Sequence, residues 1–117
     1  MSAKSLSDLK KELRKFAAER EWEKFHSPKN LVMALVAEVG ELVEPFQWLT
    51  EEQSRHLDER KLKRVEEEIS DVFIYLVQLS DKLNIDLIEA AFRKIDVNSK
   101  KYPIETARGS AKKYTEY

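Results

Sequence analysis

Residues 58–83 constrain the fold most strongly, because their apolar side chains recur at helical spacing over the whole segment. The apolar residues from Leu62 to Leu83 fall on one stripe when successive residues are turned by about 100°. Only 2 Gly and 3 Pro occur in 117 residues, while Glu, Lys, Leu and Ala are common. This composition is typical of all-α proteins. We therefore expect an all-α fold in which four main helices form a bundle.

The same spacing and the usual capping residues predict the other helices. Ser5 or Ser7 can cap the first helix, and Thr50 with Gln53 has the spacing of a capping box. Asn84 can end the long helix in a left-handed conformation, and Asp86 can start the next one. The expected helices are residues 8–21, 29–47, 58–83 and 87–101, with a short helical piece at 50–57.

Length and composition limit the organisation and the partners of the chain. We expect one domain over residues 1–117, with residues 103–117 as an extended C-terminal tail. The absence of Cys excludes disulfides and thiolate metal sites, which suits a reducing cytoplasm. Short apolar runs and no signal-peptide core argue against a membrane location. A net charge of −1, with acids and bases interspersed, argues against a nucleic-acid partner.

Residues 29–47 are apolar nearly all round the expected helix. Val32, Met33, Val36 and Val43 lie outside its main apolar stripe. A single small domain does not easily cover every face of such a helix, so we expect a second copy of the chain to cover the remaining face. The protein is therefore expected to be a homodimer or homotetramer.

Two pairs of acids carry the main functional signal. Glu38 and Glu41 lie three residues apart in one helix, and Glu68 and Asp71 repeat that spacing in another. Residues at i and i+3 share a helix face, and both pairs border an apolar stripe. Four carboxylates from two packed helices would suit Mg²⁺, with Mn²⁺ as the other candidate. The alternative is that these acids are solvated surface groups, in a chain that is 37% charged.

Aromatic residues stand near both ends of the second expected helix. Trp22, Phe25 and His26 precede Pro28, and they are either packing residues at a corner or a stacking wall for a nucleobase. Trp48 is either part of the core or a second aromatic wall. Tyr75 lies on the same flank of its helix as the second acidic pair.

A basic face is expected on the helix at residues 87–101. Lys94, Asn98 and Lys101 occur at i, i+4 and i+7, so they share that face. They form either a phosphate clamp or an ordinary solvated face near a helix C-terminus, where cations interact favourably with the helix dipole.

Together these motifs resemble the MazG-like all-α nucleoside triphosphate pyrophosphohydrolases, and in particular the dCTP pyrophosphatases. The likeness extends over nearly the whole chain. It includes Phe16-Ala17-Ala18-Glu19-Arg20, Trp22-Glu23, Phe25-His26, Glu38-Val39-Gly40-Glu41-Leu42, Phe46-Gln47-Trp48, Asp71-Val72, Ile74-Tyr75-Leu76-Val77 and Arg108-Gly109-Ser110-Ala111. One departure is the short polar connection at residues 49–59, which weakens any inference about base preference.

The resemblance implies a magnesium-dependent enzyme that cleaves a nucleoside triphosphate, with dCTP or a modified dCTP as the first candidate, to the monophosphate and pyrophosphate. We expect a water oriented by the metal or by a carboxylate to attack the α-phosphorus, with Glu41 accepting its proton. It also implies dimers or tetramers. The implied metal ligands are Glu38, Glu41, Glu68 and Asp71, with Glu41 and Glu38 catalytic; the implied substrate-binding residues are Trp22, His26, Trp48, Tyr75, Lys94, Asn98 and Lys101.

Two other functions are alternatives to this one. A di-iron carboxylate bundle normally needs two Glu-x-x-His motifs, whereas this sequence has Glu23-x-x-His26 beside Pro28 and no histidine at the right offset from either acidic pair. A non-enzymatic helical interaction module would leave the acids solvated, and Mg²⁺ would then hardly change its stability.

Overall fold

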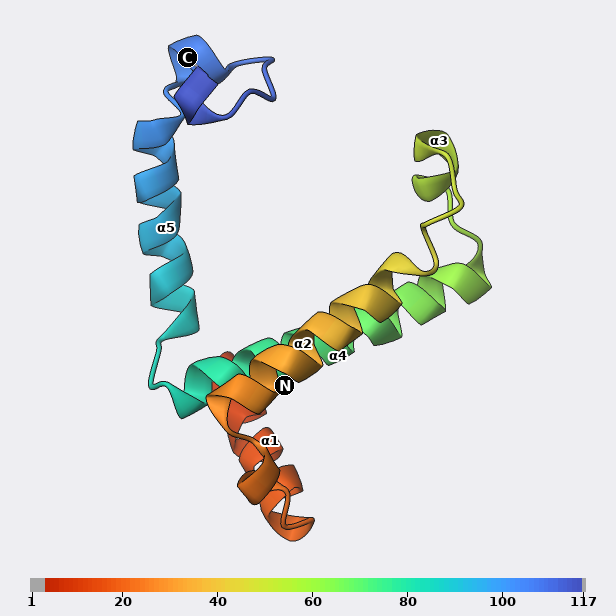
Figure 1. Cartoon of the computed structure of the whole chain (residues 1–117), viewed down its shortest axis with the longest axis vertical. Helices are drawn as coiled ribbons and strands as arrows, with labels where there is room; N and C mark the ends of the chain where they lie inside the picture. Colours follow the sequence, from red (N-terminus) through yellow and green to blue (C-terminus); the bar gives the residue numbers. More distant parts are fainter. Residues whose placement is uncertain (1–3, 117) are drawn as a thin grey trace. The chain divides into compact units, whose positions relative to one another are not determined.

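The computed structural model describes residues 4–116, and within that range every regular element is helical. The all-α prediction is therefore confirmed. Figure 1 shows the elements in chain order. They are α1 (Leu6–Glu19), the 3₁₀ turn η1 (Glu23–Phe25), α2 (Pro28–Val43), α3 (Glu51–Ser54), α4 (Glu59–Lys82), α5 (Leu87–Lys101), α6 (Ile104–Ala107) and the 3₁₀ turn η2 (Tyr114–Glu116).

The chain forms two compact units, Met1–Asn84 and Ile85–Tyr117, which are described separately. The first unit holds α1 to α4, and the second holds α5, α6 and η2. The prediction of one domain over the whole chain stays a prediction.

The first unit is organised around two antiparallel helices, α2 and α4, which lie side by side along most of their length (Figure 1). Leu31 of α2 and Val77 of α4 are almost completely buried, and Val65 of α4 is also buried. Helix α1 lies across the end of α4 and buries Ala17. The apolar surfaces of α2 and α4 pack against each other only in part, because Ile69, which lies on the expected apolar stripe of α4, is 51% exposed.

Local capping explains where the helices begin. Ser5 rather than Ser7 caps α1, and its hydroxyl accepts a hydrogen bond from the Asp8 amide while the Asp8 carboxylate accepts one from the Ser5 amide. Asp58 and Asp86 cap α4 and α5 through the same kind of side-chain acceptor. Each cap satisfies backbone N–H groups that have no partner inside the helix.

Helix α2 ends earlier than the sequence pattern suggested, at Val43 rather than near Gln47. Pro45 follows two residues later, and its ring cannot continue the regular hydrogen bonding of an α-helix. The chain turns instead, and the amides of Phe46 and Gln47 both donate to the Val43 carbonyl. The turn brings the chain to Thr50, whose capping box with Gln53 opens α3.

The segment after Pro103 is not extended throughout, in contrast to the expectation for residues 103–117. Residues Ile104–Ala107 form one helical turn, in which the amides of Thr106 and Ala107 donate to the Pro103 carbonyl. Proline suits the start of a helix because its fixed φ is pre-set for that conformation. An edge-on contact between Tyr102 and Tyr114, with ring centroids 6.0 Å apart, folds the end of the segment back on α5 within the second unit.

The outer face of α2 carries apolar side chains that the described chain does not cover. Val32, Met33, Val36 and Val43 are each more than 40% exposed. A surface of this kind is typical of a protein–protein contact. In the part of the chain that the structure describes, no helix combines the length and apolar character that crossing a membrane requires.

Candidate functional site

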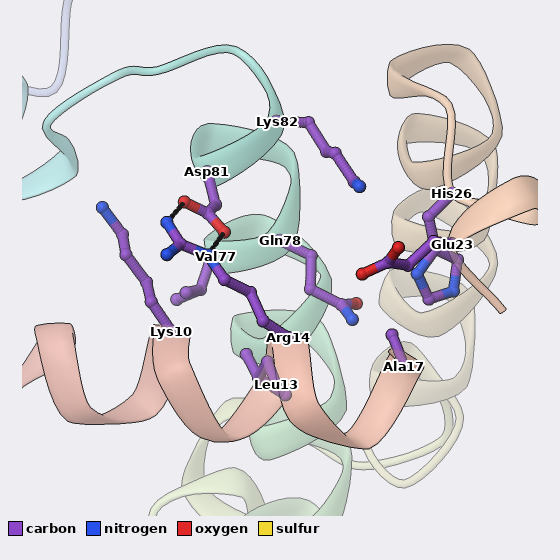
Figure 2. Close-up of a pocket in the computed structure, with 10 residues that line it drawn as sticks. All are labelled: Lys10, Leu13, Arg14, Ala17, Glu23, His26, Val77, Gln78, Asp81 and Lys82. Carbon is purple, nitrogen blue, oxygen red and sulfur yellow. Dashed lines mark hydrogen bonds and ion pairs between the residues drawn. The ribbon is translucent and has the colours of Figure 1, made fainter. Parts of the chain in front are cut away.

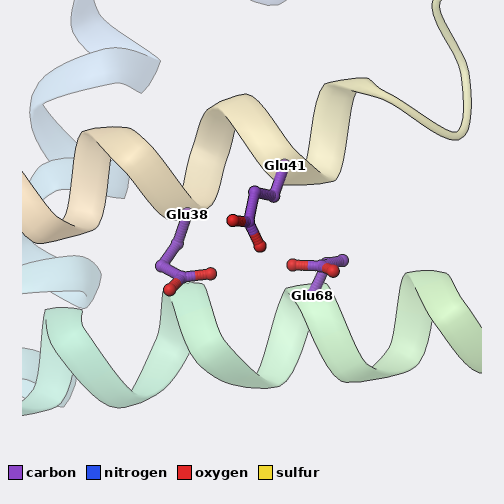
Figure 3. A group of neighbouring side chains, drawn as sticks. All are labelled: Glu38, Glu41 and Glu68. Atoms are coloured by element: carbon purple, nitrogen blue, oxygen red, sulfur yellow. The ribbon is translucent and has the colours of Figure 1, made fainter.

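Three glutamates converge in the seam between α2 and α4. Glu38 and Glu41 extend from α2 and Glu68 extends from α4, and Figure 3 shows the three carboxylates turned toward one another. One oxygen of each lies within 4.8 Å of the others. We call these three residues the acid cluster. The i, i+3 spacing places the first two on the α4-facing side of α2, and the packing of the two helices adds the third.

The acid cluster is electrostatically unfavourable on its own. Oε2 of Glu38 and Oε2 of Glu68 are both buried and have no hydrogen-bond partner. Burial raises the pKa of Glu38, and the charges of Glu41, Asp71 and Glu68 raise it further. Burial likewise raises the pKa of Glu68, with the charges of Glu41 and Asp71 adding to the effect. Buried acceptors without partners, surrounded by like charge, indicate that something positive belongs between them.

A divalent cation that prefers hard oxygen ligands fits this arrangement. Carboxylate oxygens are the ligands of choice for Mg²⁺ and Mn²⁺, and they would provide the missing partners for the buried oxygens. No histidine belongs to the acid cluster, which among residues 4–116 is the one group of three or more potential ligands close enough to share an ion. The residues present therefore fit a metal of the magnesium type.

Asp71 stands at the edge of the acid cluster. It lies one turn beyond Glu68 on α4, is exposed, and contributes the nearby charge that raises the pKa of both Glu38 and Glu68. It also lines the same groove as Glu38. Asp71 thus lies between the acid cluster and the solvent-exposed part of the groove.

That groove has a volume of about 410 Å³ and is lined by residues of α1, α2 and α4 and by the two residues that flank η1. Three of the residues that the sequence singled out for substrate binding line it, namely Trp22, His26 and Tyr75. We call it the aromatic groove. It is lined by Glu12, Leu13, Lys15, Phe16, Glu19, Trp22, His26, Glu38, Asp71, Ile74, Tyr75 and Gln78. One continuous space therefore joins flat aromatic surfaces to two carboxylates of the predicted metal site.

The aromatic residues of the groove contact one another edge to face. Trp22 lies between Phe16 and His26, with ring centroids 5.8 Å and 6.4 Å away. Arg20 stacks over the other side of Phe16, with its guanidinium carbon 3.6 Å from the ring centroid. Such contacts hold the rings in defined orientations, so that a flat ligand would meet a preformed surface.

A tight turn after α1 directs Trp22 into this position. The Trp22 amide donates to the Ala17 carbonyl, and the Glu21 amide donates to Ala18. These are the two bonds of a Schellman motif, in which the residue after the cap adopts a left-handed conformation. Glu21 holds that position with φ of 54°, although glycine is the residue usually found there.

Sequence reasoning missed several residues of the aromatic groove. Phe16 lies at helical spacing with Leu13 and Ala17 of α1, yet it is 45% exposed and lines the groove. Gln78 follows Asp71 and Tyr75 on α4 at helical spacing, so continuing that face by one turn would have found it.

The other predicted substrate-binding residues are not among those that line the aromatic groove. Trp48 follows the turn after α2, is 87% exposed and is not among the residues lining the aromatic groove. Lys94, Asn98 and Lys101 lie on α5, in the second unit, so their position relative to the acid cluster is not defined. Within that unit the Lys101 ammonium lies 4.9 Å from the centroid of the Tyr114 ring. Their proposed contacts with phosphate stay predictions.

Gly40 lies between the two glutamates of α2. Among the described residues, a Cβ atom built there would meet nothing within 4 Å apart from the backbone of α2 itself. Close packing inside the first unit therefore does not require glycine at this position. The open space leaves room for a ligand or for contact from another chain.

Comparison with known proteins agrees with these features. The MazG-like family profile matches residues 33–117. The proteins named dCTP pyrophosphatase 1 from Bos taurus and Homo sapiens are 45% and 46% identical to this chain, over 98% and 96% of its length and 69% and 67% of theirs. The crystal structure of a pyrophosphatase from Archaeoglobus fulgidus is 42% identical, superposes with a TM-score of 0.81, and is matched over 88% of this chain and 96% of that one.

These similarities cover the acid cluster as well as the helical fold, and the family named from the sequence motifs is the one that the comparisons find. The chain belongs to the MazG-like family.

Proposed function

We propose that this protein is a divalent-metal-dependent nucleoside triphosphate pyrophosphohydrolase that uses Mg²⁺, or Mn²⁺ in its place. The hydrolase class follows from the family and from the relatives named above. The observation that carries the proposal is the aromatic groove, which is lined by Trp22, His26 and Tyr75 and also by Glu38 and Asp71. A nucleotide has the same two chemistries, a flat base and an anionic chain that needs a metal.

Glu38, Glu41, Glu68 and Asp71 are the residues that would hold the metal. Two of them offer buried oxygens that lack partners, and all four are carboxylates, which suits a hard cation. When bound, the metal would neutralise phosphate oxygens and so make the phosphorus easier to attack.

The reaction needs a water, a proton acceptor and a leaving group. We assign proton acceptance to Glu41, the exposed member of the acid cluster, with Glu38 orienting the water beside it. The water oxygen forms a bond to the α-phosphorus as the bond from that phosphorus to the oxygen bridging the α and β phosphates breaks. Pyrophosphate leaves with the bonding electrons, and the water proton passes to the carboxylate.

The base and sugar would occupy the aromatic groove, against Trp22, His26 and Tyr75. Stacking on aromatic faces is worth roughly 1–3 kcal/mol per base. We propose further that Trp48 closes over the base, and that Lys94, Asn98 and Lys101 contact phosphates. Cationic and amide groups of this kind would stabilise the charge of departing pyrophosphate.

We propose that two or four copies of the chain assemble through the outer face of α2. The exposed residues Val32, Met33, Val36 and Val43 support this, because water contact with so many apolar side chains on one face is unfavourable. The assembly is proposed to act in the cytoplasm on free nucleotides, without nucleic acid or membrane partners.

The first candidate substrate is dCTP or a modified dCTP, a choice supported by the names of the mammalian relatives. The test is a panel of ribo- and deoxynucleoside triphosphates with Mg²⁺, with pyrophosphate and orthophosphate measured separately. We expect dCTP to give dCMP and pyrophosphate fastest. Release of orthophosphate alone, or of neither product from any nucleotide, would contradict the proposal.

A further inference from the structure

We propose that the Arg14–Asp81 ion pair is a positioning element, which holds α1 against α4 and thereby keeps the aromatic groove at the width that accepts a nucleobase. The inference rests on the proposed function for its effect on catalysis. Its structural part, that this pair docks α1, stands independently.

The pair joins residues that are 67 positions apart in the sequence. Arg14 Nε donates to Asp81 Oδ2 at 2.7 Å, and Arg14 Nη2 donates to Asp81 Oδ1 (Figure 2). Each of the two nitrogens thus has its own carboxylate oxygen. The Arg14 hydrogen bonds lower the pKa of Asp81 despite its partial burial. A two-point contact of this kind fixes orientation as well as distance.

Helix α1 buries little apolar surface. Ala17 is its one buried residue, and Leu9 and Leu13 are half-buried. By contrast, α2 and α4 share a seam that includes the fully buried Leu31 and Val77. Apolar burial is the main source of packing stability, so α1 is more weakly docked than α2. The ion pair therefore adds to a small apolar contact between α1 and α4.

The pair is placed where a small shift of α1 would change the groove. Leu13, next to Arg14 in sequence, and Phe16, two residues after it, line the aromatic groove from α1. Gln78, one turn before Asp81, lines the groove from α4. Behind them is a small cavity of about 30 Å³ that shares Leu13, His26 and Gln78 with the groove. That space, about enough for one or two waters, gives α1 room to move if the pair is broken.

Breaking the ion pair should change KM and kcat differently, because α1 carries no residue of the acid cluster. The acid cluster comes from α2 and α4, so loosening α1 leaves the catalytic carboxylates in place. It reduces the fraction of molecules with a correctly formed groove, and apparent affinity falls by that fraction. KM for the nucleotide should therefore rise while kcat changes little.

The test compares the wild-type protein with Arg14→Gln, Asp81→Asn and the double exchange Arg14→Asp/Asp81→Arg. Lys82→Gln is the matched control, because Lys82 lines the small cavity and lies near Asp81 but is not its hydrogen-bond donor. Two quantities are measured: amide hydrogen exchange of residues 6–19 against α2 and α4, and KM and kcat for the best nucleotide at saturating Mg²⁺.

In both single variants we expect faster amide hydrogen exchange in α1 alone and a KM about three- to fivefold higher than that of the wild type, with kcat within about twofold. The charge-swapped double variant should restore the hydrogen-exchange rate of α1 and KM, and Lys82→Gln should match the wild type. An unchanged rate of hydrogen exchange in α1 would overturn the docking claim. Faster exchange with unchanged KM, or a fall in kcat alone, would overturn the role in the groove.

Failure of the inference is distinguishable from failure of the proposed function. If the wild-type protein hydrolyses no nucleotide, the proposed function is wrong, and the exchange measurement alone decides whether the pair docks α1. If the single variants lose their helical circular dichroism, the charge-swapped double variant provides the test. A wild-type KM in that variant supports the proposal, and a raised KM overturns it.

Discussion

The two sides of the aromatic groove are built in different ways. The α2–α4 side carries the carboxylates and is held by a long apolar seam with Leu31, Val65 and Val77 buried in it. The α1 side carries Phe16 and leads into Trp22, and it has one buried residue, Ala17, together with half-buried leucines and one ion pair. Like charges held close together repel, so the side that carries them needs the more extensive packing, whereas the aromatic side is positioned by fewer contacts. We therefore predict that substitutions on the α2–α4 side lower kcat, whereas substitutions that loosen α1 raise KM.

The largest effect is expected from the carboxylates. Glu41→Gln and Asp71→Asn should each lower kcat by at least about 100-fold, because each removes a proton acceptor or a metal ligand while keeping the side-chain shape. Steady-state kinetics with Mg²⁺ measures this. Glu66→Gln, an exposed acid on α4 outside the acid cluster, is the control and should retain wild-type turnover. Either site variant with normal Mg²⁺-dependent turnover would remove the basis for the site.

The pH dependence of stability should reverse when metal is added. The folded state raises the pKa of Glu38 and Glu68, so both bind protons more tightly when folded. Their contribution to the stability of the folded state is fully present below the unfolded-state pKa of about 4.3, and it is lost as the pH rises through the raised folded-state pKa values. With Mg²⁺ the carboxylates must be deprotonated, so the metal should raise the melting temperature more at pH 8 than at pH 5.

Thermal unfolding in EDTA and in Mg²⁺ across that range provides the measurement. A metal effect that is equal at both pH values would show that these two carboxyls are not metal ligands. The EDTA series is the internal control, because it reports the carboxylates without a cation.

Neutralising one member of the acid cluster should stabilise the metal-free protein. Glu38→Gln removes a half-buried charge among like charges, so we expect a higher melting temperature than that of the wild-type protein in EDTA. The same change should abolish stabilisation by Mg²⁺. Differential scanning calorimetry in EDTA tests this, and a lower melting temperature there would mean that Glu38 makes favourable contacts that outweigh the repulsion.

The smallest effect concerns the turn that leads from α1 to Trp22. Glu21→Gly should stabilise the protein by less than about 1 kcal/mol, because glycine accepts the left-handed conformation without strain but gains freedom in the unfolded chain. Urea denaturation compares it with Lys11→Gly, in the exposed middle of α1, which should lose about 1 kcal/mol. Equal destabilisation by both changes would contradict a Schellman role for Glu21.

Local physics explains what was correctly expected from the sequence. The all-α class, the start of α4 at its Asp58 cap, the capping of α5 by Asp86 and the left-handed Asn84 at φ 54° all depend on residues within a few positions of each other. The family could also be named, because its motifs are short and local. The i, i+3 spacing of each acidic pair likewise fixes a shared face before any packing occurs.

Tertiary packing decided the rest. The distance of Glu68 from Glu38 and Glu41 depends on the register of α4 against α2, which no local pattern contains. Phe16 lies on an apolar stripe, but whether that stripe meets the core or a groove depends on how far α1 overlaps α4. The Arg14–Asp81 pair spans 67 positions, so it exists only once the helices have packed. Sequence determines which face of each helix is apolar or charged, whereas the meeting of faces is a property of the whole packed unit.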